Sequence, residues 1–220
     1  MGTGPELGEL DTINGELVEM TRLVGSAMNR ATQALLDADL PLAESVIDAD
    51  ARIDILTSDI EERCLDLIAE THPAEEDLRL VIGALRIASS LERMGDLAEH
   101  VAKQARLRYP RLSIPLELRG TFAEMGGLAE AIVSKTGSVI ATRDVGLAAD
   151  IARHDEDVDR LHRELFTIVL TPSWSHGVEA AIDVTLLSRY YERYADHAVS
   201  VTKRVITIVT GAPYAGVTLT

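Results

Sequence analysis

Four pairs of carboxylates, each spaced four residues apart, are the side chains of this sequence best placed to do chemistry. Glu92 and Asp96 lie in the stretch LERMGDLAEHVAK, and Glu192 and Asp196 lie in YERYADHAVSVTK, one hundred residues later. A spacing of four places both carboxylates of a pair on one face of a helix, where like charges repel. Such a pair favours either protonation of one carboxyl group or the binding of a cation.

The other two pairs stand one expected helix earlier in the chain. Asp50 and Asp54 belong to DADARID, and Asp155 and Asp159 belong to DEDVD. In an antiparallel hairpin, residues equally far from the turn lie at the same level. Positions 50 and 96 share the midpoint 73 with positions 54 and 92, and positions 155 and 196 share the midpoint 175.5 with positions 159 and 192. Both midpoints fall in predicted turns, THP and TPSWSHG, so the sequence predicts two clusters of four carboxylates.

Clusters of hard oxygen donors suit Mg²⁺, Ca²⁺, Mn²⁺, iron or zinc. Three histidines, His154, His162 and His197, stand near the second cluster, and Asp159 with His162 has the spacing found in ferritin-like sites. The matching second Asp/Glu-x-x-His element is missing, which argues against a carboxylate-bridged metalloenzyme. A third interpretation is a helical scaffold with solvated acids, because the chain contains 36 Asp and Glu residues.

Apolar residues recur with a helical period along almost the whole chain. Pro41 and Pro73 fit the first turns of helices, Asp144 fits an N-cap, and Gly211 fits a helix end. The β-branched run VITIVT is interpreted as the end of the last helix. The predicted helices cover about 8–38, 41–70, 73–108, 116–142, 144–170 and 177–210.

These six long antiparallel helices predict an all-α fold of two tandem three-helix bundles with an internal two-fold repeat. The low aromatic content, 4%, also favours packed helices. The stretch YPRLSIP carries two prolines and is the best linker in the chain. We therefore expect a first bundle over 1–110 and a second over 111–220.

Composition excludes several classes of protein. The net charge of −15 repels phosphate backbones, so nucleic acid is excluded as a direct partner. The single cysteine, Cys64, rules out a disulfide framework. No apolar run nears the ~20 residues of a transmembrane helix, and no secretory signal is found, so a cytoplasmic protein is expected. Phosphate-binding glycine loops and nucleophile motifs are missing, so we expect no enzyme.

The repeated acid phrases, together with DLPLAESVIDADARID and THPAEEDLRLVIGALRIASSLERMGDLAEHVAK, resemble the PhoU family of phosphate-transport regulators over about 16–211. The resemblance implies a cytoplasmic protein, often a homodimer. It implies repression of the phosphate-starvation response through the ATPase subunit of the phosphate ABC transporter and a phosphate-sensing histidine kinase. The opening MGTGPELGEL departs from the Met-Arg and nearby Phe that are common in the family.

The resemblance also implies metal binding at the acid motifs, as multinuclear iron or zinc clusters. The residues that carry over are Asp50, Asp54, Glu92 and Asp96 in the first half, and Asp155, Asp159, Glu192 and Asp196 in the second half.

Overall fold

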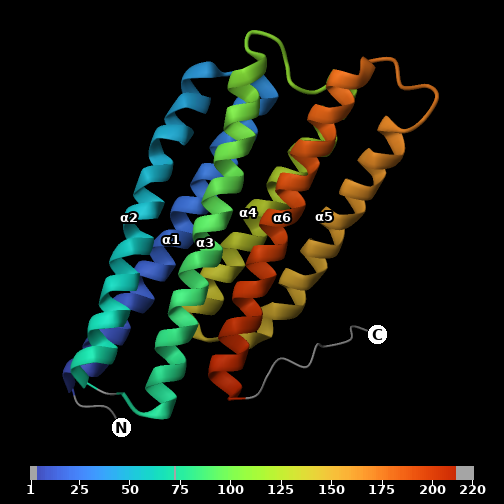
Figure 1. The fold of residues 1–220 in the computed structure, drawn as a ribbon. Helices are drawn as coiled ribbons and strands as arrows, with labels where there is room; N and C mark the ends of the chain where they lie inside the picture. Colours follow the sequence, from blue (N-terminus) through green and yellow to red (C-terminus); the bar gives the residue numbers. More distant parts are fainter. Residues whose placement is uncertain (1–3, 72, 212–220) are drawn as a thin grey trace.

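Six long helices make up the computed structural model, which describes residues 4–71 and 73–211 (Figure 1). No strand occurs in the described residues, and the predicted all-α fold of two tandem three-helix bundles is confirmed. Short 3₁₀ turns at Leu116–Leu118 and Val145–Leu147 precede the fourth and fifth helices. The helices are α1 (Gly4–Asp37), α2 (Leu40–Thr71), α3 (Glu75–Arg108), α4 (Arg119–Thr142), α5 (Ala148–Val169) and α6 (Gly177–Thr210).

The first helix of each half ends in the same way. Ala38 after α1 and Arg143 after α4 adopt left-handed backbone, with φ of 50° and 55°. An aspartate follows each: Asp39 accepts a hydrogen bond from a backbone amide at the start of α2, and Asp144 accepts one in the turn that leads into α5. Asp144 therefore caps the 3₁₀ turn Val145–Leu147, and α5 itself begins at Ala148, four residues later than predicted. The third helix begins at Glu75, two residues later than predicted, because Ala74 remains extended before its acidic first turn.

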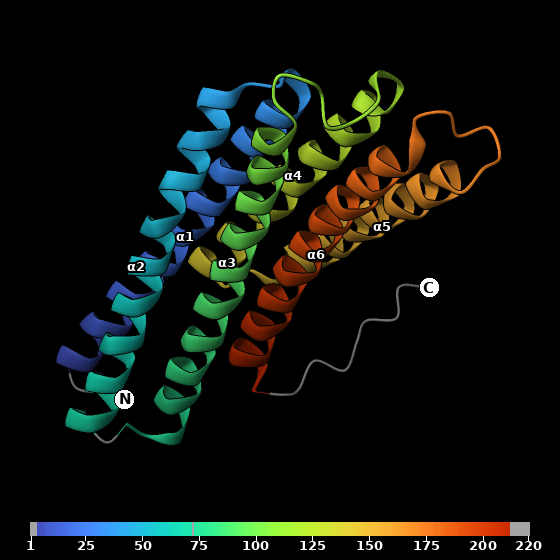
Figure 2. The ribbon, with the colours of Figure 1, turned by 45° about the horizontal axis from the view of Figure 1, so that its top comes forward.

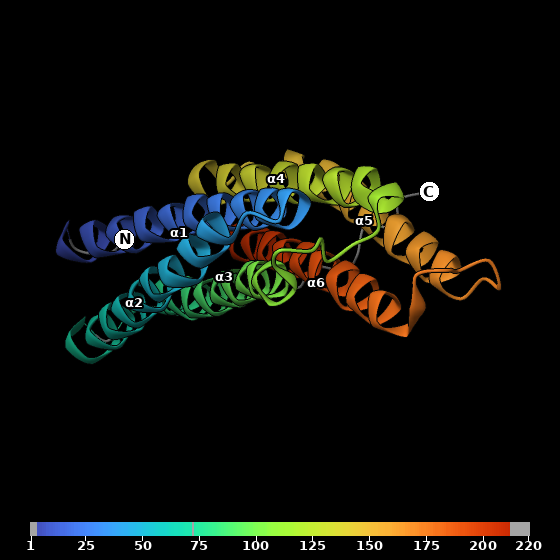
Figure 3. The ribbon, with the colours of Figure 1, turned by 90° about the horizontal axis from the view of Figure 1, so that it is seen from above.

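Four helices form the centre of the molecule. The helices α1, α3, α4 and α6 pack on one another, while α2 and α5 lie at the two outer edges (Figures 1 and 2). Seen from above, α1 and α4 lie on one side of the adjoining pair α3 and α6 (Figure 3). No helix in the described part of the chain has the length and apolar composition that a membrane span requires.

The repeat seen in the sequence extends to the packing. Every position from 82 to 105 on α3 has the same degree of burial as the position 100 residues later on α6. The reason is that each of these helices packs against three others: α3 against α1, α2 and α6, and α6 against α3, α4 and α5. The duplicated burial pattern fixes which side chains remain at the helix edges.

The two halves share one continuous core. Tyr191 and Tyr194 of α6 are fully buried and reach across to α1, where their hydroxyls hydrogen-bond with Thr32 Oγ1 at 2.7 Å and with the Val24 carbonyl at 3.2 Å. A Cβ atom on Gly126 of α4 would lie 2.6 Å from Thr32, so α4 approaches α1 closely. The boundary between 110 and 111 therefore separates two sequence repeats, and the assignment of each repeat as a domain stays a prediction.

A buried ion pair joins the end of α3 to the start of α6. Arg108 donates to both oxygens of Asp183, from Nε at 2.6 Å and from Nη2 at 2.9 Å, and it also contacts Glu179. The Asp183 side chain is 6% exposed. A carboxylate this well buried depends on its partner, because leaving a buried charge unpaired is costly.

We predict that Arg108→Ala lowers the free energy of unfolding by about 3 kcal/mol, because it leaves the Asp183 carboxylate buried without a cation. Denaturant unfolding followed by circular dichroism measures the loss. Arg111→Ala is the matched control, since Arg111 is 72% exposed and its pair with Glu179 spans 4.0 Å; its loss should stay below about 1 kcal/mol. Equal losses in the two variants would show that the buried pair does not hold the halves together.

Candidate functional site

The eight predicted acidic residues lie on the helix pairs α2–α3 and α5–α6, at the edges of the buried core. Ile53 separates Asp50 from Asp54, and it is 2% exposed. In the second half the fully buried Val158 takes the same place. Apart from Asp54, which is exposed, all the acids are half-buried.

In the first cluster, burial and the neighbouring negative charges raise the pKa of two carboxyl groups. Burial raises the pKa of Asp50 to about 6, with further contributions from the negative charges of Glu99, Asp54 and Asp96. Burial and the charge of Asp96 also raise the pKa of Glu92, and Asp54 adds to the effect. The four predicted acids therefore lie within electrostatic reach of one another. Glu99 belongs to the same cluster, although the spacing-four pattern of acids does not indicate it.

Gly95 explains how α2 and α3 come close enough to form this cluster. A Cβ atom at position 95 would lie 3.0 Å from Asp50 Oδ1 and 2.9 Å from Ile53 Cδ1. The Asp50 carboxylate thus lies against the backbone of α3. The glycine within LERMGD was visible in the sequence, but nothing in the pattern indicated that its missing side chain makes room for Asp50.

The second cluster shows the same electrostatics. Burial, followed by the charges of Asp159 and Asp196, raises the pKa of Asp155 to about 7. Burial and the charge of Asp196 raise the pKa of Glu192. One oxygen of Glu192, Oε2, is buried without a hydrogen-bond partner. A buried oxygen without a hydrogen-bond partner destabilises the fold, so a proton or a cation bound at this cluster would stabilise it.

Arginines compensate part of the negative charge. Arg93 contacts Asp96 at 2.8 Å, and the equivalent Arg193 stands 3.8 Å from Asp196. Both arginines are thus paired with acids of the predicted clusters. The second cluster has two further pairs, Arg189 with Glu192 and Arg163 with Asp159.

The donor atoms of the clusters suit a hard cation, but their positions in this structure do not yet form a binding site. Their donors are carboxylate oxygens, two carboxyl groups in each cluster have raised pKa values, and one Glu192 oxygen has no partner. Between residues 4 and 71 and between 73 and 211, however, no three Asp, Glu, His or Cys side chains converge closely enough to hold a metal ion. A bound cation would draw these carboxylates together and release some of their arginine contacts.

The histidines contribute little to the clusters. His162 Nδ1 is hydrogen-bonded to Ser188 Oγ at 2.8 Å, and its pKa is lowered by burial. His100 Nδ1 lies 2.5 Å from the backbone carbonyl of Asp96. His154 Nδ1 is buried without a hydrogen-bond partner. The arrangement gives no support to the pair of Glu-x-x-His elements that a ferritin-like enzyme needs.

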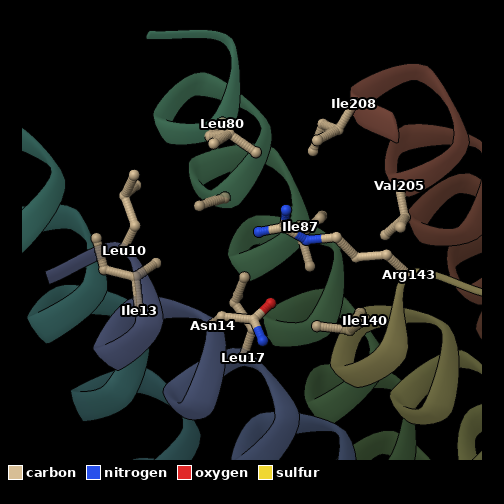
Figure 4. Close-up of a pocket in the computed structure, with 11 residues that line it drawn as sticks. Leu10, Ile13, Asn14, Leu17, Leu80, Ile87, Ile140, Arg143, Val205 and Ile208 are labelled. Atoms are coloured by element: carbon tan, nitrogen blue, oxygen red, sulfur yellow. The ribbon is translucent and has the colours of Figure 1, made fainter. Parts of the chain in front are cut away.

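An apolar pocket lies away from both clusters, where α1, α3, α4 and α6 come together near one end (Figure 4). Ile13, Ile87 and Val205 line it, and the Arg143 side chain extends across it from the end of α4. None of the eight predicted acids lines this pocket.

The acid pairs of both halves fall within segments that match a known family. The model of the PhoU domain matches the chain twice, over residues 17–105 and 122–205. The chain belongs to the PhoU family.

Named relatives agree with this assignment over nearly the whole length of the chain. The phosphate-specific transport system accessory protein PhoU homolog 2 of Mycobacterium tuberculosis is 48% identical over 93% of this chain and 96% of its own. Homolog 1 of Mycobacterium leprae is 46% identical over 93% of this chain and 92% of its own. These relatives are named as accessory proteins and not as enzymes.

Two solved structures share the fold. The crystal structure of PhoU from Pseudomonas aeruginosa superposes with a TM-score of 0.81 at 30% identity, over 93% of this chain and 99% of that one. The phosphate transport system regulatory protein PhoU from Streptococcus pneumoniae gives a TM-score of 0.83 at 26% identity, over 94% and 98% of the two chains. The resemblance found in the sequence is therefore confirmed.

We predict that Asp155→Asn stabilises the metal-free protein at pH 8. The folded state raises the pKa of Asp155 to about 7, so it binds a proton more tightly than the unfolded chain does. The ionised carboxylate therefore destabilises the fold above pH 7, and this cost disappears as the pH falls toward 4. Melting in the presence of a chelator should show a gain of about 2–4 °C at pH 8, with little difference near pH 4.

Glu156→Gln is the matched control, because Glu156 is the exposed neighbour of Asp155 on the same helix. This variant should change stability by less than about 0.5 kcal/mol at either pH. A loss of stability in Asp155→Asn at pH 8 would mean that the carboxylate is already satisfied by cationic partners.

Proposed function

We propose that this PhoU-family chain is a negative regulator of phosphate uptake and of the phosphate-starvation response. It acts by contact with the ATPase subunit of the phosphate ABC transporter and with a phosphate-sensing histidine kinase. The observation that carries the proposal is the match of both halves to the PhoU domain, with relatives named as accessory proteins of a phosphate-specific transport system. We further propose that the protein is a homodimer located in the cytoplasm.

The two acidic clusters are proposed as the sites that hold divalent cations, iron or zinc. Asp50, Asp54, Glu92 and Asp96 would hold one group of ions. Asp155, Asp159, Glu192 and Asp196 would hold the other. The raised pKa values and the unpartnered Glu192 oxygen support this assignment.

When bound, a cation supplies positive charge that removes the repulsion among the carboxylates. It stabilises the helix pairs by mass action, because the unfolded chain offers no assembled site. The role of these residues is therefore structural: they fix the relative positions of α2 with α3 and of α5 with α6. No catalytic step is required of them.

Affinity capture from the native host tests the regulatory proposal. We expect the tagged chain to recover the transporter ATPase, the sensor kinase or both, with recovery that differs between phosphate-replete and phosphate-starved cells. A tagged helical protein of similar net charge serves as the control bait, because an acidic surface alone can retain basic proteins. Recovery of neither protein in either state would contradict the proposal.

A further inference from the structure

The helices α3 and α6 run antiparallel with a regular register. His100 lies against Tyr190 with ring centroids 5.3 Å apart, and Arg108 is paired with Asp183. Toward the other end, a Cβ atom on Gly83 would contact Ile208, and one on Gly211 would lie 3.9 Å from Arg79 Nη1. A residue number on α3 and the number of the residue level with it on α6 therefore add up to about 290.

This register brings positive charges together along one edge of the α3–α6 interface. Arg79, Arg86 and Arg93 follow one another at intervals of seven on α3, so they share a helix face. The α6 residue level with Arg86 is Arg204. Burial and then the charge of Arg86 lower the pKa of Arg204. Arg86 and Arg204 thus lie close enough to repel each other.

Two of the cations at this edge lack an acidic partner. Arg79 is paired with Glu75, and Arg93 is paired with Asp96. Among the residues that the structure describes, neither Arg86 nor the half-buried Arg204 has a carboxylate within ion-pair distance. This lack of a partner stands out because the chain has 36 acidic residues and a net charge of −15.

We propose that Arg86 and Arg204 form a binding site for a tetrahedral oxyanion, and that inorganic phosphate is its ligand. Two guanidinium groups can each donate paired N–H bonds to the oxygens of one phosphate. The bound anion would remove the repulsion between the arginines and would neutralise the charge of the half-buried Arg204.

Such a site would allow the regulator to sense inorganic phosphate directly. This role rests on the proposed function. The binding of phosphate rests only on the described geometry and is measured on the purified chain alone. A failure to capture the transporter or the kinase would leave the oxyanion site standing, and a failure to bind phosphate would leave the regulatory proposal standing.

Titration calorimetry of the purified chain with inorganic phosphate, at constant ionic strength, tests the site. We expect saturable binding that weakens at least tenfold in Arg86→Gln and in Arg204→Gln. Arg106→Gln is the matched control, since Arg106 is exposed on the same helix and has no ion pair among the described residues; it should bind as the unaltered chain does. Equal weakening in all three variants, or no saturable binding, would overturn the proposal.

Melting curves provide a second test, because they distinguish an arginine that binds phosphate from one that only stabilises the fold. Without phosphate, Arg86→Gln should melt about 1 °C higher, because a like-charge repulsion has been removed. With phosphate, only the unaltered chain and Arg106→Gln should gain stability. A lower melting temperature together with an unchanged response to phosphate would contradict the site. So would binding to phosphatidic acid vesicles without binding to free phosphate, because the ligand would then be a lipid headgroup.

Discussion

Carboxylates that repel one another are held together in this protein because the residues beside them are locked into the core. Ile53 lies between Asp50 and Asp54, and the fully buried Leu91 precedes Glu92. Neither acid pair can turn away from its neighbour unless apolar surface is exposed to water, at a cost of about 1.5–3 kcal/mol for each large side chain. The burial pattern thus imposes an electrostatic cost on the folded state. Burial, and then the repulsion from neighbouring carboxylates, raises the pKa values of Asp50 and Asp155 as part of that cost.

The same constraint accounts for the central position of α3 and α6. Each packs against three other helices, so most of its circumference is buried and its polar residues are confined to narrow edges. On the edge shared with α2 or α5 these residues are acids, and on the edge shared between α3 and α6 several are cations. An acidic chain thereby carries both an excess of negative charge and a localised excess of positive charge on the same two helices.

The helices, the hairpin levels and the PhoU family could be predicted from the sequence because each rests on local periodicity or on a repeat at a fixed offset. The midpoints at 73 and 175.5 predicted which acids lie at the same level because the α2–α3 and α5–α6 turns are short. The packing of one half on the other could not be predicted in this way. No turn connects α3 to α6, so their register, and with it the approach of Arg86 to Arg204, leaves no periodic signal. The buried Asp183 was missed for the same reason.

The central claim is that the two carboxylate clusters are strained without a cation and relieved by one. The test is to measure the melting temperature of the chelator-treated protein with and without added Mn²⁺ or Zn²⁺. Three proteins are compared: the unaltered chain, the double variant Asp96→Asn with Asp196→Asn, and the control Asp48→Asn. Asp48 is an exposed acid on α2. The account predicts that the metal stabilises the unaltered chain and the control, and that the double variant melts higher without metal yet gains little from it. Equal stabilisation of all three proteins by the metal, or of none, would contradict the account.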